Sequence, residues 1–371
     1  MASARAMIST EAWVLRRGGP GGGTGPLIRE SLELGEPEPD ELLVRPLYGC
    51  WEGNMEHALQ RRPIDVCALR DEDRVVLGNA GVVEVIRAGS AIDTVQPGDL
   101  GMVFCNGTPD RHGYPITIFG YDAPGTVGVL AKLTKLRRHQ FLPIPERSRF
   151  APGQWAAFSL RYVTAWANWR VAYACWRAQA EEASPDQLVV VAWGGGVSLA
   201  QLTLARALGH RAVMIASRPQ RLQQLRALGL ETIDRDALRA DHFEADLLEA
   251  VRAKTDGHGA SIFIDNLGMQ RTTLKALARE GVIATCGWKH GAVHTVSRAM
   301  ECINRHIHVH THYARYAEGV DAVRFALEHG WMPPADGPVY AWDDVPRLAD
   351  DYAHGRIDSY FPLFCHDERG R

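Results

Sequence analysis

The sequence lacks both a dominant charge and a long apolar run. Its 371 residues carry 41 lysines and arginines against 44 aspartates and glutamates, a formal net charge of −3. This balance excludes a dedicated nucleic-acid binder by bulk electrostatics. No segment reaches the roughly 20 apolar residues that a membrane span needs, and the chain does not open with a signal-peptide pattern. We therefore expect a soluble, cytoplasmic protein without a nucleic-acid or membrane partner.

The chain also lacks paired cysteine motifs. Its seven cysteines are an odd number, and no two are spaced as Cys-x-x-Cys. This pattern favours reduced thiols over a disulfide framework or a zinc ribbon.

Two regions of different character follow one another along the chain. Strand and turn patterns dominate the first region, with strands predicted at 41–48, 75–86 and 100–104 and a helix near 54–61. Such a pattern is typical of an irregular β-barrel. After residue 152, short apolar strands (188–192, 212–216, 262–264 and 281–286) alternate with helices, which predicts a doubly wound parallel sheet of the α/β class. We expect domains at 1–152 and 153–312, with 313–371 returning to the first.

A glycine triplet, Gly194, Gly195 and Gly196, directly follows the first of these apolar strands and opens a helix. In this strand–turn–helix arrangement the helix N-terminus faces a pyrophosphate, and glycine lets the backbone approach it. A dinucleotide site is therefore our leading interpretation. The alternative is a tight turn with no ligand, since a turn needs glycine in either case.

The end of the next strand indicates which dinucleotide binds. Sites for NAD place a carboxylate there for the adenosine ribose, whereas this chain has Ser217, Arg218 and Arg221. Guanidinium groups pair well with a 2′-phosphate. We predict NADPH as the cofactor; the alternative is that both arginines are solvated surface charges.

Several motifs, in this order, resemble the medium-chain dehydrogenase/reductase superfamily. They are residues 78–86 with Gly89, residues 97–99, residues 163–166, the glycine turn with residues 205–209, and residues 281–287. The resemblance implies a GroES-like β-barrel catalytic domain, split in sequence around a Rossmann domain, with the active site in the cleft between them. It also implies a homodimer, in which the strand near 306–312 pairs with its mate.

Departures from the family pattern point to its zinc-independent branch, similar to quinone oxidoreductases and enoyl-thioester reductases. Zinc-dependent members carry Gly-His-Glu where this chain has Gly78, Asn79 and Ala80, and Cys50 alone cannot hold a catalytic zinc. We therefore assign no metal site. Within the glycine turn, Trp193 and Ser198 replace the usual glycine or alanine.

The resemblance also implies site residues. It places the loop after Cys50 over the nicotinamide, which makes Trp51, Asn54 and His57 the candidate catalytic residues. Asn54 can polarise a carbonyl and His57 can supply a proton; a surface-helix role for His57 is the open alternative. The candidate cofactor-binding residues outside the glycine triplet and the arginine segment are Thr164, Val197, Asn266 and Gly287.

The function implied is NADPH-dependent reduction of an activated carbon–carbon double bond in an enone or enoyl thioester. The alternatives are a metal-free carbonyl or alcohol oxidoreductase and a non-catalytic ligand-binding member. The expected partner is a small-molecule substrate, with a coenzyme A or carrier-protein thioester among the options.

Two further patterns leave alternatives open. His306, His308, His310 and His312 alternate, so they share one face of a strand; packing is the leading interpretation and metal binding the alternative. Lys132, Lys135, Arg137 and Arg138 form a basic run. It is either a solvated face or a site for the phosphates of a thioester carrier.

Overall fold

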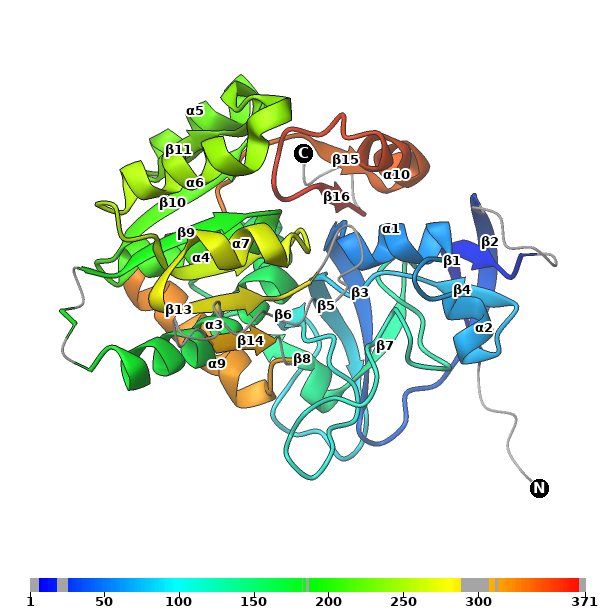
Figure 1. The fold of residues 1–371 in the computed structure, drawn as a ribbon. Helices are drawn as coiled ribbons and strands as arrows, with labels where there is room; N and C mark the ends of the chain where they lie inside the picture. The colour runs from blue at the N-terminus through cyan, green and yellow to red at the C-terminus, as the bar shows by residue number, and fades with distance from the viewer. Residues whose placement is uncertain are drawn as a thin grey trace. The chain divides into compact units, whose positions relative to one another are not determined.

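The computed structural model describes residues 7–18, 26–181, 183–184, 187–287, 307–310 and 313–366. The chain forms two compact units (Figure 1). The first contains Met1–Leu160, Arg315–Val320 and Met332–Arg371, and the second contains Arg161–Ala314 and Asp321–Trp331.

The first unit is built from two sheets around one apolar core. A three-stranded sheet has the order β2 (Leu27–Gly35), β1 (Met7–Arg16), β4 (Arg74–Val76). The larger sheet has the order β15 (Val339–Ala341), β16 (Leu363–Cys365), β3 (Glu41–Cys50), β5 (Gly81–Ala88), β6 (Leu100–Val103), β8 (Phe141–Pro143), and β7 (Thr134–Arg137) also pairs with β3. The C-terminal strand β16 thus joins the sheet formed by the N-terminal part of the chain. Three helices complete the unit: α1 (Gly53–Gln60), α2 (Val66–Arg70) and α10 (Val345–Ala353).

The prediction of a single strand over 75–86 is wrong. The chain leaves β4 after Val76 and enters β5 only at Gly81, and the two strands belong to different sheets. Gly78 makes the break, because its φ is +113° and a Cβ there would lie 2.7 Å from Cγ2 of Val129. The segment reads as one apolar run because both strands bury their side chains in the same core.

The second unit contains the parallel sheet that the alternating pattern predicts. Its six strands have the order β11 (Glu231–Asp234), β10 (Arg211–Ala216), β9 (Val189–Trp193), β12 (Ala260–Asp265), β13 (Leu277–Thr285), β14 (Ile307–His310), and every neighbouring pair is parallel. This is the strand order 3-2-1-4-5-6 of a dinucleotide-binding fold. The doubly wound sheet is therefore confirmed.

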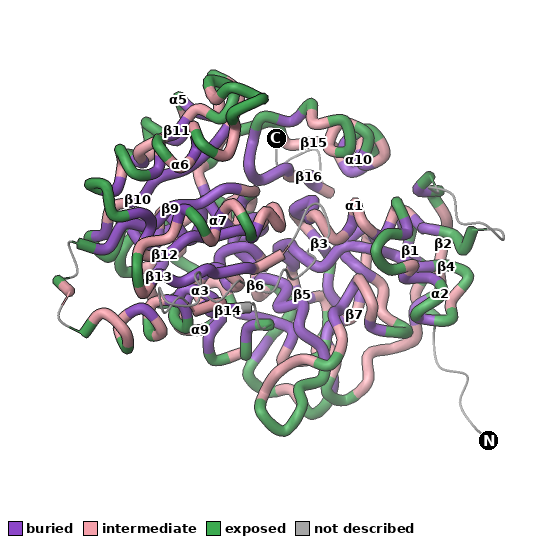
Figure 2. The backbone as a smooth tube through the Cα atoms, in the orientation of Figure 1, coloured by how far each residue is buried: buried purple, intermediate pink, exposed green. Residues whose placement is uncertain are grey.

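The helices that connect successive strands of this sheet are α4 (Gly196–Ala207), α5 (Pro219–Ala227), α6 (Phe243–Lys254) and α7 (Gln270–Ala276). The long helix α3 (Pro152–Gln179) precedes β9, and α9 (Tyr316–His329) follows β14. The residues of β9 and β12 are mostly buried, whereas α5 carries several exposed residues (Figure 2). Within the described part of the chain, every helix is too short or too polar to cross a membrane.

Candidate functional site

The glycine turn lies at the carboxyl end of β9, next to the point where the strand order reverses. Gly194 has φ +123°, and a Cβ there would lie 2.8 Å from Oγ of Ser198 and 2.9 Å from Cβ of Asn266. A Cβ on Gly195, in contrast, would meet no described atom within 4 Å. Gly194 is therefore required by the backbone, and the space beside Gly195 is open at the start of α4. Backbone amides in the first turn of a helix have no partner within it, so this turn offers donors to a pyrophosphate.

Trp193 does not occupy this open space. Its side chain is 1% exposed and packs in the core with an edge-to-face contact to Phe263, at 5.3 Å between ring centroids. The indole Nε1 donates a hydrogen bond to Oδ1 of the buried Asp265 at 2.7 Å. The same oxygen accepts from the backbone N–H of Leu267 and Gly268. Trp193 therefore fixes the loop after β12 and leaves the glycine turn accessible.

Ser198 and Asn266 connect the loops that follow three neighbouring strands, β9, β12 and β13. The Ser198 hydroxyl donates to the carbonyl oxygen of Trp193 and accepts from Nδ2 of Asn266, both at 2.8 Å. Oδ1 of Asn266 accepts from the backbone N–H of Cys286 at 2.7 Å. The ends of β9, β12 and β13 are thus held together by side chains, and Gly287 follows directly with φ +157°.

The arginine segment leaves the sheet beside the glycine turn. β10 runs parallel to β9 with Ile215 opposite Trp193, so Ser217 and Arg218 emerge at the same edge as Gly194. Arg218 adopts φ +75° immediately before α5, a conformation that is rare for a residue other than glycine. Backbone strain of this kind is concentrated at functional sites. Arg221 lies in the first turn of α5.

Two of the other predicted cofactor residues lie in helices of this unit. Val197 is in the first turn of α4, directly after the glycine triplet. Thr164 lies in α3, and its side chain is partly exposed.

The predicted catalytic residues lie in the first unit, at the end of β3 and in α1. Trp51 is fully buried in the barrel core together with Met55 and Ala58. Asn54 is in the first turn of α1, and its Oδ1 is buried and finds no hydrogen-bond partner among the described residues. His57 is in the last turn and half-buried, and burial lowers its pKa from the ordinary 6.5. At neutral pH His57 is therefore mainly the uncharged imidazole.

Asn79 is a candidate site residue that the sequence analysis missed. It is 1% exposed, and neither Oδ1 nor Nδ2 has a hydrogen-bond partner within the described ranges. Leaving a buried polar group unsatisfied costs about 1–3 kcal/mol. The sequence does contain a signal for this residue, which is an amide within an otherwise apolar run. The sequence analysis treated that amide only as the replacement of a zinc ligand.

Cys105 and Glu52 are both buried in this unit. Burial, and then the charge of Glu52, raise the pKa of the Cys105 thiol to about 12. Glu52 is itself 4% exposed and precedes the first residue of α1. Cys105 is therefore a neutral thiol at physiological pH, whereas a reactive cysteine has a lowered pKa.

The described residues contain no group of three or more His, Cys, Asp or Glu side chains that could hold a metal ion. Of the histidine row, His306 and His312 lie outside the described residues, as does the side chain of His310. β14 forms an edge of the parallel sheet beside β13, and His308 is partly buried in it.

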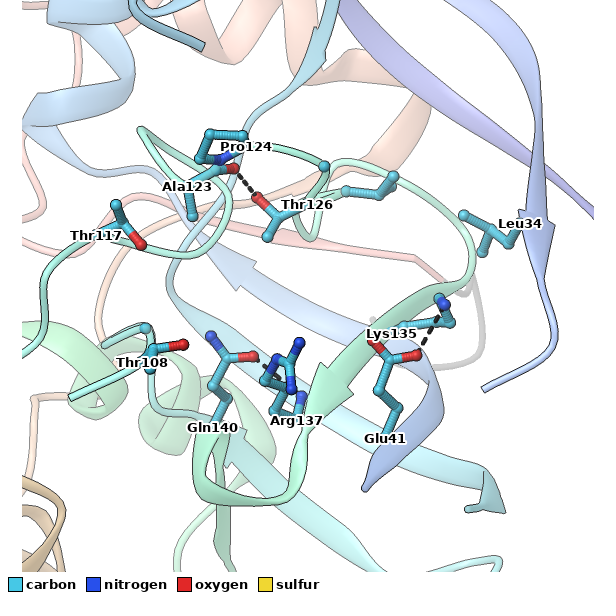
Figure 3. Close-up of a pocket in the computed structure, with 13 residues that line it drawn as sticks. Leu34, Glu41, Thr108, Thr117, Ala123, Pro124, Thr126, Lys135, Arg137 and Gln140 are labelled. Carbon is cyan, nitrogen blue, oxygen red and sulfur yellow. Dashed lines mark hydrogen bonds and ion pairs between the residues drawn. The ribbon is translucent and has the colours of Figure 1, made fainter. Parts of the chain in front are cut away.

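The basic run is engaged with partners inside the first unit. Lys135 pairs with Glu41 at 2.8 Å and Arg137 with Asp40 at 2.9 Å. Lys132 donates to the carbonyl oxygen of His366 at 3.0 Å. Lys135 and Arg137 line a cavity of about 270 Å³ with Gln140, Thr108 and Thr117 (Figure 3). Since each cation has an acid or carbonyl partner, the run is better explained as part of the barrel than as a phosphate-binding face.

Comparison with known proteins finds a matching family model and similar curated proteins. Residues 196–327, which begin at the last glycine of the glycine turn and include the arginine segment, match the zinc-binding dehydrogenase family. Crotonyl-CoA reductase from Streptomyces collinus is 23% identical over 298 residues, which cover 73% of this chain and 63% of the relative. Geraniol dehydrogenase from Castellaniella defragrans is 26% identical over 312 residues, covering 73% of each chain.

A solved structure of similar fold is that of a 2-octenoyl-CoA carboxylase reductase in complex with NADP and 2-octenoyl-CoA. It superposes with a TM-score of 0.80 at 20% identity and covers 96% of this chain and 87% of that one. The likeness confirms the fold as a GroES-like barrel with a Rossmann sheet. In this fold and in its match to a zinc-binding dehydrogenase model, the chain is similar to medium-chain dehydrogenases/reductases.

Proposed function

We propose that this protein is a zinc-independent, NADPH-dependent oxidoreductase that reduces the activated double bond of an enone or enoyl thioester. The observation that carries the proposal is the open glycine turn beside the arginine segment at one edge of the parallel sheet. The named relatives support the chemistry, since one is a crotonyl-CoA reductase and the similar structure holds NADP with an enoyl thioester.

The residues of the second unit fit this cofactor. The amides of Gly195, Gly196 and Val197 are donors for the pyrophosphate. Ser217, Arg218 and Arg221 supply a hydroxyl and two guanidinium groups for the 2′-phosphate, with no carboxylate among them. Thr164, Asn266 and Gly287 complete the cofactor-binding set. When bound, NADPH supplies a hydride.

The first unit supplies the groups that act on the substrate. As a hydride adds to the β-carbon, negative charge develops on the carbonyl oxygen, and a hydrogen-bond donor there lowers the barrier. The amide of Asn54 is suited to polarise that carbonyl. His57 is suited to deliver a proton to the α-carbon, and its lowered pKa makes the imidazolium form a stronger acid. Trp51 supports the loop from the barrel core.

A second candidate is a metal-free carbonyl or alcohol oxidoreductase. The relative that favours it is geraniol dehydrogenase, at 26% identity. The two candidates share the cofactor site and differ in the bond that is reduced. A non-catalytic member remains a third alternative, and it predicts no affinity for a nicotinamide cofactor.

Calorimetric titration with NADPH and, in parallel, NADH tests the cofactor. We expect NADPH to bind at least tenfold more tightly. Preference for NADH would contradict the assignment of the arginines to a 2′-phosphate site. Binding of neither cofactor would contradict the proposal that the protein is a nicotinamide-dependent enzyme. Assays of NADPH oxidation with crotonyl-CoA, a cyclic enone and a matched saturated aldehyde then separate the candidates. A double-bond reductase oxidises NADPH with the first two substrates, whereas a carbonyl or alcohol oxidoreductase does so with the aldehyde and not with crotonyl-CoA.

A further inference from the structure

We propose that Asn79 is a catalytic residue whose Nδ2 donates a hydrogen bond to the carbonyl oxygen of the substrate. This inference rests on the proposed function and adds to it a second amide donor, besides Asn54, for the oxygen on which negative charge develops.

The backbone around Asn79 is held on both sides. The N–H of Gly78 donates to the carbonyl oxygen of Gly120, and the N–H of Cys50 donates to the carbonyl oxygen of Ala80, both at 3.0 Å. These bonds fix the short segment between β4 and β5 against the end of β3. A side chain on such a segment is positioned before any ligand arrives, which is what a transition-state donor requires.

The carboxamide itself is buried and unsatisfied. Asn79 is 1% exposed, and both polar atoms of its side chain lack a hydrogen-bond partner in the part of the chain that the structure describes. Buried polar groups are almost always paired, so an exception calls for a reason such as a ligand. Asn54, four residues beyond Cys50, has a buried Oδ1 in the same condition. Two amides of one unit, both near the end of β3, thus retain binding capacity.

The chemical character of Asn79 matches an uncharged carbonyl. Its Nδ2 offers two N–H donors without a net charge, so it binds a neutral carbonyl and binds the enolate more strongly. Cys105, in the core of the same barrel, does not compete as a nucleophile, because it is a neutral thiol with its pKa raised to about 12. Glu52, whose charge contributes to that shift, is buried at the start of α1.

The reaction balances with one reductant, a reduced nicotinamide. A hydride adds to the β-carbon and forms a C–H bond, the π electrons of the double bond move to the α-carbon and the carbonyl oxygen, and the substrate becomes an enolate. The hydrogen bond from Asn79 to that oxygen strengthens as the charge grows. Protonation of the α-carbon restores the carbonyl, so the double bond gains a hydride and a proton in all.

The test compares Asn79→Leu, which keeps the shape and removes both polar atoms, with the wild type. We expect kcat with crotonyl-CoA to fall 100-fold or more, the usual effect of losing one such donor. The NADPH affinity should change less than twofold. The melting temperature should stay level or rise, because an unsatisfied buried group has been removed.

Thr134→Val is the matched control. Thr134 is fully buried in the same barrel, but its hydroxyl donates to the carbonyl oxygen of Val127. We expect this variant to melt at a lower temperature with kcat within twofold of wild type. A structural role for Asn79 would give the same result in Asn79→Leu, and that outcome would overturn the proposal.

Failure of the two proposals is distinguishable. A wild type that reduces crotonyl-CoA alongside an equally active Asn79→Leu overturns only the role of Asn79. A wild type that reduces neither crotonyl-CoA nor a cyclic enone overturns the proposed function, and with it this role. Binding of the unreactive product butyryl-CoA gives a readout without turnover, and we expect Asn79→Leu to weaken it about tenfold.

Discussion

The hydroxyl oxygen of Ser198 lies 2.8 Å from Nδ2 of Asn266 and 2.8 Å from the carbonyl oxygen of Trp193. It therefore bridges the loops after β9 and β12 at the edge where the cofactor is expected. Glycine or alanine, the usual residues at this position of the family pattern, would leave both partners without the hydroxyl. The serine thus replaces close backbone packing with a specific hydrogen-bonded link.

Replacing Ser198 with alanine should weaken NADPH binding. One hydrogen bond contributes about 1 kcal/mol, so we expect the Kd to rise roughly fivefold as the glycine turn loosens. Calorimetry measures the change. Ser261→Ala is the control, because Oγ of Ser261 accepts from the N–H of Val189 and links the same two strands at their opposite ends. An equal rise in Kd for both variants would show that the effect is not specific to the turn.

Replacing Trp193 with glycine, a usual residue at this position of the family pattern, should destabilise the fold. Trp193→Gly removes a side chain that is 1% exposed and deprives Asp265 of the indole donor. We expect the free energy of unfolding to fall by about 3–5 kcal/mol, as for other buried aromatic truncations. Urea denaturation measures it. Trp193→Phe keeps an aromatic ring and should lose about 1–3 kcal/mol through the lost indole hydrogen bond to Asp265, whose carboxylate keeps its backbone donors. Tighter NADPH binding by Trp193→Gly would contradict our account.

Removing the guanidinium groups should change the choice of cofactor. For Arg218→Ala and Arg221→Ala we expect the NADPH Kd to rise about tenfold or more and the NADH Kd to change little, because only NADPH carries the 2′-phosphate. Arg226→Ala lies on the same helix, where the guanidinium bonds to Thr232, and it should leave both affinities unchanged. Equal losses for both cofactors would identify the arginines as general structural groups.

His57 should govern part of the pH dependence of the reaction. Burial lowers its pKa from 6.5, so the imidazolium that delivers the proton is depleted as the pH rises through that lowered value. We expect kcat to decline with an apparent pKa below 6.5, and His57→Gln to lower kcat and abolish this dependence. Initial rates between pH 5 and 8 at saturating NADPH measure it.

The same shift has a consequence for stability. The unfolded chain binds a proton at His57 more readily than the folded one, so the fold is favoured above pH 6.5 and loses stability as the pH falls through the lowered pKa.

His139→Gln is the control for the predicted pH dependence of kcat. Burial also lowers the pKa of His139, which contacts the carbonyl oxygen of Gly107. If His139→Gln removed the pH dependence of kcat and His57→Gln did not, the proton donor would have to be reassigned.

Local sequence patterns determined much of this protein. Continuous apolar strands, a glycine triplet and regularly spaced helices predict the parallel sheet, because strands buried on both faces need apolar residues throughout. The sequence also shows that no carboxylate follows the second strand, since Ser217, Arg218 and Arg221 come directly after that strand in the chain. In each case the residues that matter are neighbours in sequence.

Tertiary structure decided what depends on distant residues. The 75–86 run divides between two sheets because Gly78 turns the chain against Val129, about 50 positions away. Trp193 is harmless to the glycine turn because Asp265, 72 positions on, accepts its indole N–H. Asn79 became a candidate only when its side chain proved to be buried without a described partner. Burial and hydrogen bonding are properties of the folded surroundings, and no local pattern specifies them.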